Sequence, residues 1–293
     1  FISPCISGYL IKKSYFKISS NRTQSFNVLI SVNQNDYIEL RNLGYGSLFV
    51  VQLIYHIERG ELFALKKPNS SDKEIHKLIE REKANYEKIH CPFIPKFYGT
   101  VKNYDSDSII IEFINGQTLD ECQFNKYEED EIILIIYKLL FIVEYFHCNN
   151  FLIRDLKPNN LMLTKTNDIV MIDFDRVISN SIQEYSHNLI NEYAAPEVLT
   201  KELYSKKSDI YTLGRVIEFI MKKANREMKI LEINDIIMQC INKEADKRPS
   251  ITKIIRDFFN KPKIMSSEEQ FNLGNIYSTG EYIKRDINKV IYY

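Results

Sequence analysis

The sequence predicts an α+β fold of two lobes, in which a small antiparallel β lobe precedes a larger helical lobe. Two observations support this prediction. Short runs rich in β-branched and aromatic residues, separated by glycine-containing turns, dominate the first part of the chain. Segments with helical spacing of apolar residues dominate the second part. Strands followed by helices, rather than alternating with them, are typical of an α+β protein. The boundary between two such lobes is a common ligand site.

Five runs in the first part of the chain have the composition of strands, and turn signals separate them. Gly44-Tyr45-Gly46 and Glu58-Arg59-Gly60 separate the first three runs. A charged segment, Asp72 to Ile89, carries apolar residues at helical spacing and predicts a helix between the third and fourth strands. The expected strands are 37–43, 48–55, 61–67, 96–102 and 108–113.

Helical patterns dominate the chain from Glu128 onward, after a break at Asn115-Gly116. The longest apolar run, Ile132 to Val143, is interrupted by Lys138 and falls well short of the roughly 20 residues that a membrane span needs. We therefore expect a buried helix here, and no membrane partner. The other expected helices lie around 210–220, 231–241 and 251–259.

The composition limits the class of protein. Lysine plus arginine and aspartate plus glutamate each total 39, so the net charge is zero, which argues against a nucleic-acid partner. The five cysteines are irregularly spaced without a C-x-x-C pair, so neither a disulfide framework nor a zinc site is expected. No basic-then-apolar signal segment is visible. We expect an intracellular, cytoplasmic protein.

An acid, a lysine and an amide occur within six positions after the long apolar segment: Asp155, Lys157 and Asn160. Asp173 follows thirteen residues beyond Asn160, in Ile172-Asp173-Phe174. Asp155 could orient and deprotonate a hydroxyl group, and Lys157 could neutralise a phosphoryl group in transfer. Asn160 and Asp173 offer the oxygen ligands that a hard divalent cation prefers. Phosphoryl transfer needs such a set, because its catalysis is mostly positioning and charge neutralisation.

The order and spacing of these residues closely resemble the catalytic loop and metal-binding segment of eukaryotic protein kinases. This resemblance implies transfer of the γ-phosphate of ATP to a hydroxyl group of a protein substrate. It makes Asp155 the base, adds Lys157 and Asn160 to the catalytic set, and assigns magnesium to Asn160 and Asp173. Because Lys157 stands two positions after the base, the chain resembles serine/threonine kinases rather than tyrosine kinases.

Segments that resemble the nucleotide-binding motifs of protein kinases also occur, in the same order as in that family. Leu43 to Val51 resembles a kinase glycine-rich loop, although a Gly-x-Gly between strands is by itself more often a plain hairpin. Phe63-Ala64-Leu65-Lys66 resembles the strand that carries the nucleotide lysine. Lys66 and Lys67 face opposite sides, so one of them should point inward. Glu82 is the expected helix partner of this lysine, and Glu80 is the alternative.

Ile111 to Gly116 resembles the hinge between kinase lobes, in which backbone groups of Glu112 and Ile114 would contact adenine and Ile111 would line the back of the pocket. An ordinary strand end before a turn is the alternative. The residues that the resemblance implies for nucleotide binding are Leu43, Gly44, Gly46, Val51, Ala64, Lys66, Glu82, Ile111, Glu112 and Ile114.

Further matches extend the resemblance over residues 37–260, with a small lobe at about 37–114 and a large lobe at about 115–260. Tyr193 to Glu197 resembles the motif that closes the activation segment, and the resemblance implies an ion pair between Glu197 and Arg248. Asp209 would hold the catalytic loop from a central helix.

Four positions depart from the family pattern. Phe49 replaces the third glycine of the loop, Ile153 replaces a histidine, Asp175 replaces the glycine after Asp173-Phe174, and Ile190 replaces a threonine. These departures support an alternative, a pseudokinase scaffold that binds nucleotide and protein partners without efficient transfer. The last of them also leaves the choice between serine/threonine and tyrosine acceptors open.

The two ends of the chain differ from its middle. Residues 1–36 are polar and carry no assignment. Residues 266–293 resemble one Sel1-like helical repeat, and the markers are Leu273-Gly274, Tyr277, Gly280, Asp286 and Lys289. A single repeat cannot bury its own apolar face, so we expect it to be the first of an array that continues past Tyr293 and binds protein partners. A terminal helix pair packed on the large lobe is the alternative.

Overall fold

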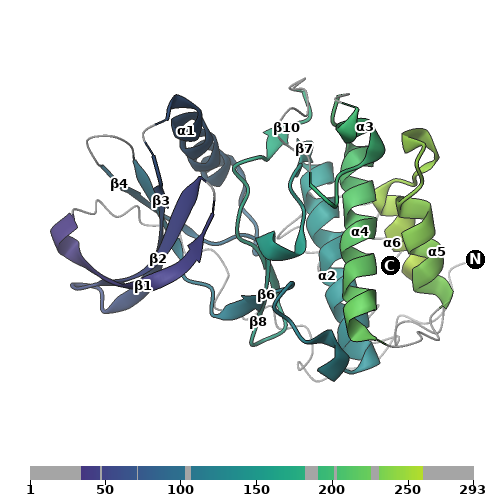
Figure 1. Cartoon of the computed structure of the whole chain (residues 1–293), viewed down its shortest axis with the longest axis horizontal. Coiled ribbons are helices and arrows are strands. Elements are labelled where there is room, and N and C mark those ends of the chain that lie inside the picture. Colours follow the sequence, from purple (N-terminus) through teal and green to yellow (C-terminus); the bar gives the residue numbers. More distant parts are fainter. Residues whose placement is uncertain are drawn as a thin grey trace, which may run out of the picture.

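The computed structural model describes residues 34–46, 48–70, 72–102, 107–181, 191–200, 203–225 and 231–259. Within these residues the chain forms a β-rich lobe and a helical lobe, as Figure 1 shows, and this confirms the predicted two-lobed arrangement. The expected Sel1-like repeat lies outside the described residues, as does most of the unassigned N-terminal segment.

The small lobe is built on one antiparallel sheet with strand order β1-β2-β3-β5-β4. All five expected strands are present, within two residues of the predicted bounds. One prediction was wrong: Gly44 and Tyr45 are not in the turn but continue β1, since they pair with Val51 and Val50 of β2. The strands are β1 (Tyr37–Tyr45), β2 (Phe49–His56), β3 (Glu61–Pro68), β4 (Phe97–Val101) and β5 (Ser108–Glu112).

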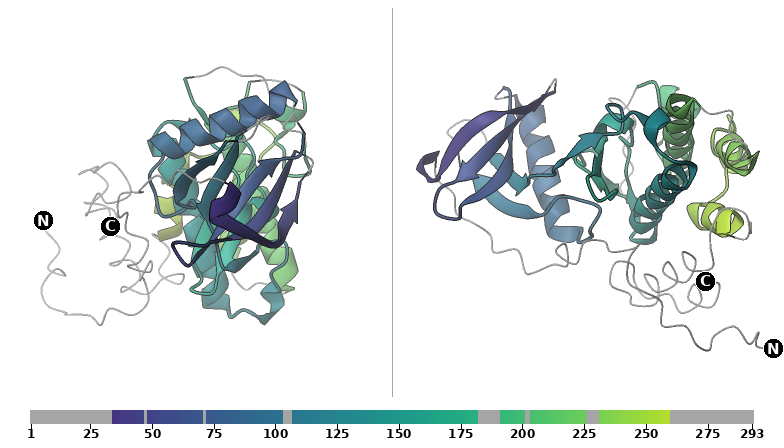
Figure 2. Two further views of the ribbon diagram at one scale, coloured as in Figure 1. Left: turned by 90° about the vertical axis from the view of Figure 1, so that its left-hand side faces the viewer. Right: turned by 90° about the horizontal axis from the view of Figure 1, so that it is seen from below.

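Helix α1 (Lys73–Lys88) lies across one face of this sheet, beside β3 and β5 (Figure 2). Asp72 begins the helix, because its carboxylate accepts a hydrogen bond from the N–H of Glu74 at 2.9 Å. The residues on its buried face follow the helical period and include two polar ones: Ile75, Leu78, Ile79, Glu82, Asn85 and Tyr86. Polar side chains on a buried face require partners, and these two have them in the site described below.

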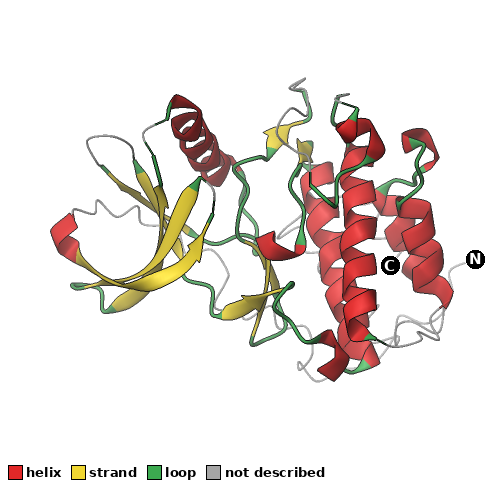
Figure 3. Ribbon diagram, viewed as in Figure 1, coloured by secondary structure: helices red, strands yellow, loops and turns green. Residues whose placement is uncertain are grey.

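The large lobe is mostly helical, as Figure 3 shows. Its two long helices, α2 and α4, pack against each other, and each begins with a capping box, Glu128 with Glu131 and Ser205 with Ser208. None of the described helices combines the length and apolar character required to cross a bilayer. The helices are α2 (Glu129–Cys148), α3 (Pro196–Leu199), α4 (Lys206–Ala224), α5 (Leu231–Cys240) and α6 (Ile251–Phe259).

Five short strands in the large lobe were absent from the sequence prediction. They form a three-stranded sheet, β6-β8-β9, and a two-stranded pair, β10 with β7. Two to four residues are too few for an alternating pattern to be recognised. The short strands nevertheless frame the catalytic loop, because β7 ends and β8 begins on either side of 153–160. Their bounds are β6 (Gly116–Thr118), β7 (Phe151–Leu152), β8 (Leu161–Thr164), β9 (Ile169–Met171) and β10 (Ile178–Ser179).

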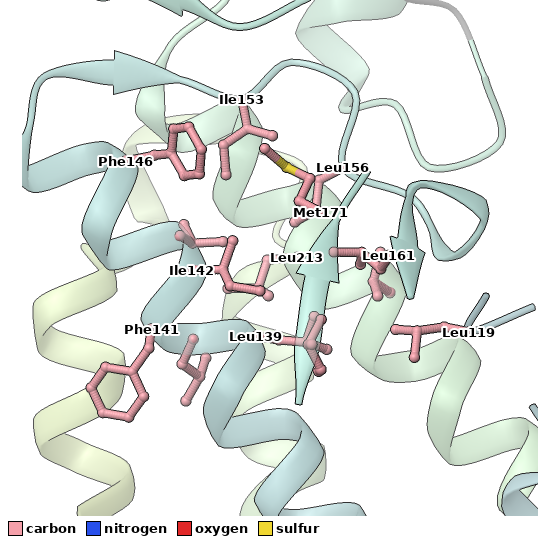
Figure 4. Close-up of a cluster of buried hydrophobic side chains, with 14 of the residues drawn as sticks. Leu119, Leu139, Phe141, Ile142, Phe146, Ile153, Leu156, Leu161, Met171 and Leu213 are labelled. Carbon is pink, nitrogen blue, oxygen red and sulfur yellow. The ribbon is translucent and has the colours of Figure 1, made fainter. Parts of the chain in front are cut away.

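The catalytic loop is also anchored to the core by its own apolar residues. Figure 4 shows Ile153 and Leu156 pointing into the same cluster as Phe146, Met171 and Leu213. Ile153 and Leu156 are 1% and 0% exposed. The polar residues between and after them are therefore presented from a backbone with little freedom to move.

Candidate active site

Lys66 points inward from β3 and joins three segments of the chain. Its Nζ lies 2.6 Å from Oε2 of Glu82 on α1 and 2.9 Å from Oδ1 of Asp173, which follows β9. The side chain is 4% exposed. Lys67 lies on the opposite face of the strand and pairs with Glu39. Of the two adjacent lysines, Lys66 is therefore the one that reaches the boundary between the lobes.

The helix partner of Lys66 is Glu82 and not the alternative, Glu80. Glu82 is fully buried, whereas Glu80 is exposed and lies 3.9 Å from Lys83. A sequence signal for this choice exists: Glu82 stands seven residues after Ile75 and four after Leu78, which places it on the apolar face of the helix.

The three charged groups set each other's protonation. Burial by itself lowers the pKa of Lys66, but Asp173 and Glu82 outweigh it and the net pKa is raised. Burial raises the pKa of Asp173, but Lys66 outweighs that effect, so the pKa lies below its usual range. Burial also raises the pKa of Glu82, against the opposing effect of Lys66. A charged ammonium facing an ionised Asp173 is the resulting arrangement.

A second cluster forms around Asp155. Lys157 Nζ lies 2.7 Å from Oδ2 of Asp155, and Asn160 Nδ2 donates to the same oxygen and to the Asp155 carbonyl, both at 3.0 Å. Asn191 Nδ2 donates to the other oxygen, Oδ1, at 3.3 Å. Lys157 also lowers the pKa of Asp173, so the two clusters lie within electrostatic reach of each other. The structure therefore brings together the four polar residues that the sequence singled out.

Asp209 holds the backbone just before Asp155. It is fully buried, and its two oxygens accept hydrogen bonds from the N–H of Ile153 and the N–H of Arg154, both at 3.0 Å. Tyr204 donates its hydroxyl at 2.8 Å, and His147 Nε2 lies 2.9 Å away. The predicted role of Asp209 is thus observed. The contributions of Tyr204 and His147 were not foreseen, because they depend on how α2 meets α4.

The backbone conformation of Arg154 is the reason that this loop needs its hydrogen bonds to Asp209. Its φ of 71° is a left-handed conformation, which costs a residue with a side chain about 1–2 kcal/mol. Such strain persists only where the surroundings fix it. Ile153, which replaces the histidine of the family, is placed through its backbone N–H and its buried side chain. The loop is therefore positioned without that histidine.

The segment after Asp173 is attached to α1. Asn85 Nδ2 donates to the carbonyls of Phe174 and Val177 at 3.1 and 3.0 Å. Tyr86 contacts Phe174 edge to face at 4.4 Å between ring centroids and stacks on Phe97 of β4 at 5.2 Å. This aromatic column connects the small lobe to Asp173, so a shift of α1 would move the carboxylate that Lys66 contacts.

The expected glycine-rich loop lies at the β1–β2 turn. Gly44 is in β1, Leu43 and Val51 pack against the core, and Gly46 donates its N–H to the Phe49 carbonyl at 2.8 Å. Phe49, the departure from the family pattern, turns inward. It is 7% exposed, and its ring centroid lies 4.5 Å from Lys66 Nζ. The aromatic ring thus covers the ammonium that the sequence assigns to nucleotide phosphates.

We expect Phe49→Ala to tighten ATP binding by roughly 2- to 30-fold, because removing a cation–π contact worth about 0.5–2 kcal/mol uncovers the ammonium. The binding constant is measured by titration with ATP and magnesium. Val50→Ala is the matched control, since Val50 pairs with Lys67 on the other face. Weaker binding in Phe49→Ala would mean that the ring supports the nucleotide instead of covering its site.

The expected hinge residues lie at the end of β5 and just after it, at the lobe boundary. Ala64 and Ile111 are neighbours across β3 and β5, and both are 5% exposed. The N–H of Glu112 donates to the Lys96 carbonyl at 2.8 Å, so any contact of Glu112 with adenine would come from its carbonyl. Ile114 is 6% exposed and precedes β6. The order of these residues fits the expected hinge.

Asp175, which replaces a glycine of the family, is 4% exposed. Burial, and then the neighbouring Asp173, raise the pKa of this carboxyl to about 6. When the pKa of an acid is higher in the folded state than in the unfolded state, ionisation of that acid destabilises the fold. The effect is complete at pH values above the folded pKa and absent at pH values below the unfolded pKa. Asp175 therefore costs stability at neutral pH.

Asp175→Asn is expected to raise the free energy of unfolding by roughly 3 kcal/mol above pH 6, since two pKa units correspond to about that amount. The gain should disappear between pH 6 and pH 4, where the wild-type carboxyl becomes protonated in both states. Urea unfolding at pH 4 and pH 7.5 measures it. An equal difference at both pH values would contradict the electrostatic cause.

The donors at the lobe boundary fit magnesium held together with nucleotide. Within the described ranges, no group of three or more His, Cys, Asp or Glu side chains could hold a metal ion by itself. Asp173 supplies one carboxylate, a third exposed, and Asn160 supplies one amide oxygen. Magnesium commonly binds one or two protein ligands and completes its shell with phosphate oxygens and water, so a sparse donor set is the expected one.

The motif at Tyr193 to Glu197 is bonded to the helical lobe through Glu197. Arg248, 1% exposed, donates to both oxygens of Glu197 at 2.7 and 2.8 Å. Ser208 also donates to Glu197, at 2.8 Å. The predicted pair is thus observed as a bidentate one, which adds geometric specificity to the attraction. Ile190, the fourth departure, lies outside the described residues.

The two-lobed fold and these two clusters have the arrangement of a protein kinase domain, and comparison with known proteins agrees. Residues 37–228 match the protein kinase domain family. The chain belongs to the protein kinase family.

Several serine/threonine and related kinases are similar to this chain. The carbon catabolite-derepressing protein kinase of Candida glabrata is 31% identical over 195 residues, which are 64% of this chain and 31% of that protein. The serine/threonine-protein kinase dst4 of Dictyostelium discoideum is 27% identical over 264 residues, 78% of this chain and 54% of that protein. The chain spans about a third of the length of the carbon catabolite-derepressing kinases that it matches.

Proposed function

We propose that this chain transfers the γ-phosphate of ATP to a serine or threonine hydroxyl of a protein substrate. The observation that carries the proposal is the contact of Lys66 with both Glu82 and Asp173, next to an Asp155 carboxylate held on both oxygens. If Lys66, Glu82 and Asp173 formed only a structural ion-pair cluster, a further carboxylate held in a fixed orientation nearby would not be needed. Phosphate transfer needs such a carboxylate, because the acceptor hydroxyl must be oriented as its proton is lost.

The geometry of this chain's own residues supports the following proposed roles. Asp155 orients the acceptor hydroxyl and accepts its proton on a carboxylate oxygen. Lys157, 2.7 Å from Asp155, places a positive charge beside the phosphoryl group in transfer. Lys66 binds the remaining phosphates, with Glu82 fixing the direction of its side chain. Asn160 and Asp173 would hold magnesium, which neutralises phosphate charge when bound.

Transfer from labelled ATP to the chain itself and to a generic protein acceptor tests this proposal. The expected result is incorporated label that depends on magnesium and is absent in Asp155→Ala, which controls for a contaminating kinase. Alkaline hydrolysis releases phosphate from phosphoserine and phosphothreonine and leaves phosphotyrosine intact, so it identifies the acceptor. No incorporation by freshly purified wild-type protein would overturn the proposal.

The alternative function is a pseudokinase scaffold, and Phe49 over Lys66 favours it. The acidic Asp175 next to Asp173 favours it as well, because it adds negative charge where ATP phosphates would bind. Nucleotide that raises the thermal unfolding midpoint of a chain without transfer activity would identify this scaffold.

We also propose that residues 266–293 form a Sel1-like unit that docks protein partners, and that the kinase acts inside the cell. Both proposals rest on the sequence. Limited proteolysis of the chain followed by mass spectrometry tests the first: a protected fragment that contains 266–293 supports a folded unit, and rapid cleavage within it contradicts one.

A further inference from the structure

Asn191 uses both ends of its side-chain amide. Its Oδ1 accepts a hydrogen bond from the N–H of Tyr193 at 2.8 Å, which closes a turn of the kind that asparagine favours. Its Nδ2 donates to Oδ1 of Asp155 at 3.3 Å. Because the first bond fixes the plane of the amide, the second is aimed at the carboxylate. Nothing in the sequence pattern had singled out this residue.

The turn that carries Asn191 rests on a fixed frame. The N–H of Ala194 donates to the Asn191 carbonyl at 3.1 Å, and Tyr193 is buried with its ring near Phe219 of α4. A few residues later, Glu197 is locked to Arg248. Asn191 therefore reaches Asp155 from a turn anchored to the large lobe, 36 residues away in sequence.

The other carboxylate oxygen of Asp155 is held by Lys157 and Asn160. The final torsion of an aspartate side chain has a broad energy profile, so contacts on one oxygen leave the plane of the carboxylate loosely set. A donor on the second oxygen fixes that plane. Each carboxylate oxygen has about two acceptor sites, so Oδ1 can hold Asn191 and still receive a substrate hydroxyl.

We propose that Asn191 is a positioning residue that fixes the orientation of the Asp155 carboxylate for proton acceptance from the substrate. This inference rests on the proposed function, since it concerns the base of the same transfer reaction. Asn191 touches neither nucleotide nor substrate in this assignment and acts only through Asp155. The neighbouring Ile190 has no side-chain hydrogen-bond donor, whereas Asn191 has one.

The test is Asn191→Asp in the full chain, because aspartate separates the two roles of the amide. Its carboxylate still accepts from the N–H of Tyr193, so the turn is kept. The donor to Asp155 is replaced by a negative oxygen about 3.3 Å away. We expect kcat to fall at least tenfold while the KM for ATP stays close to the wild-type value. The repulsion between the two carboxylates should lower the thermal unfolding midpoint only slightly, because Lys157 also contacts the Asp155 carboxylate.

Two further variants complete the design. Asn191→Ser keeps a short group that can both accept and donate, and it should retain more kcat than Asn191→Ala, which can do neither. Asn150→Asp is the matched control: Asn150 is exposed, its Oδ1 accepts from Asn180, and aspartate can do the same. This control adds the same charge to the large lobe and should transfer phosphate like the wild type.

The outcomes separate this inference from the proposed function. If wild type transfers phosphate and Asn191→Asp is equally active, the inference is wrong and the proposed function stands. If Asn191→Asp loses activity together with a large drop in thermal midpoint, the role is structural and the inference is also wrong. If the wild-type protein itself transfers no phosphate, the proposed function is wrong and this inference, which depends on it, is wrong as well.

Discussion

Replacing Asp155 by alanine is expected to lower the rate of phosphate transfer by roughly 10²–10⁴-fold, the usual contribution of a positioned general base. The carboxylate is the group on which Lys157, Asn160 and Asn191 converge. Its removal leaves the acceptor hydroxyl without an oriented partner. The KM for ATP should change little, because Lys66 and the residues around it remain in place. Steady-state transfer from labelled ATP measures both quantities.

The control for this prediction is Asp155→Asn, which keeps the volume of the side chain and one acceptor oxygen. It should lose activity to a similar extent while unfolding at nearly the wild-type temperature, since the loop is held mainly by Asp209. Retention of transfer within threefold of wild type in both variants would assign the base to another residue.

Asp209→Asn is expected to lower the free energy of unfolding by roughly 3–5 kcal/mol, the usual cost of breaking a buried charged network. The two oxygens of Asp209 face four hydrogen-bonding groups, on Ile153, Arg154, Tyr204 and His147. An amide replaces one acceptor oxygen by a donor, so at least one backbone N–H is left facing another N–H in a dry interior. The left-handed Arg154 then loses part of its support.

The same substitution should also lower kcat by roughly 10- to 100-fold, since a displacement near 1 Å of a catalytic group has effects of that size. Urea unfolding measures stability, and transfer at a temperature where the variant is folded measures kcat. Asp246→Asn is the matched control, because Asp246 is exposed and should change stability by less than about 0.5 kcal/mol. An unchanged kcat in folded Asp209→Asn would show that the loop does not need this anchor.

Most regular elements of the fold could be predicted from the sequence, because their signals are local. The helix α1 follows from the spacing of Ile75, Leu78, Ile79 and Tyr86, and the strands of the small lobe follow from composition and turns. The five short strands of the large lobe could not be predicted. Two to four residues form a strand there because neighbours supply their hydrogen bonds, not because their own pattern demands it.

The chemical identities of the candidate site could also be predicted, but not all of its contacts. The sequence named Lys66, Asp155, Asn160 and Asp173 from spacing and family resemblance. It left open whether Glu80 or Glu82 pairs with Lys66, and it identified Phe49 only as a departure from the glycine pattern of the loop. In the structure Phe49 covers Lys66 at 4.5 Å, a contact that depends on how the turn folds back over β3.

The sequence by itself determined the family, the order of the elements and the set of reactive groups, since these depend on residue type and on spacing along the chain. The tertiary structure decided which groups meet. Lys66 contacts Asp173 across 107 residues, and Asn191 reaches Asp155 from a turn anchored to another part of the large lobe. Such contacts are set by the packing of whole elements against each other. The same packing places Asn191, which no sequence pattern singles out, 3.3 Å from the carboxylate of Asp155.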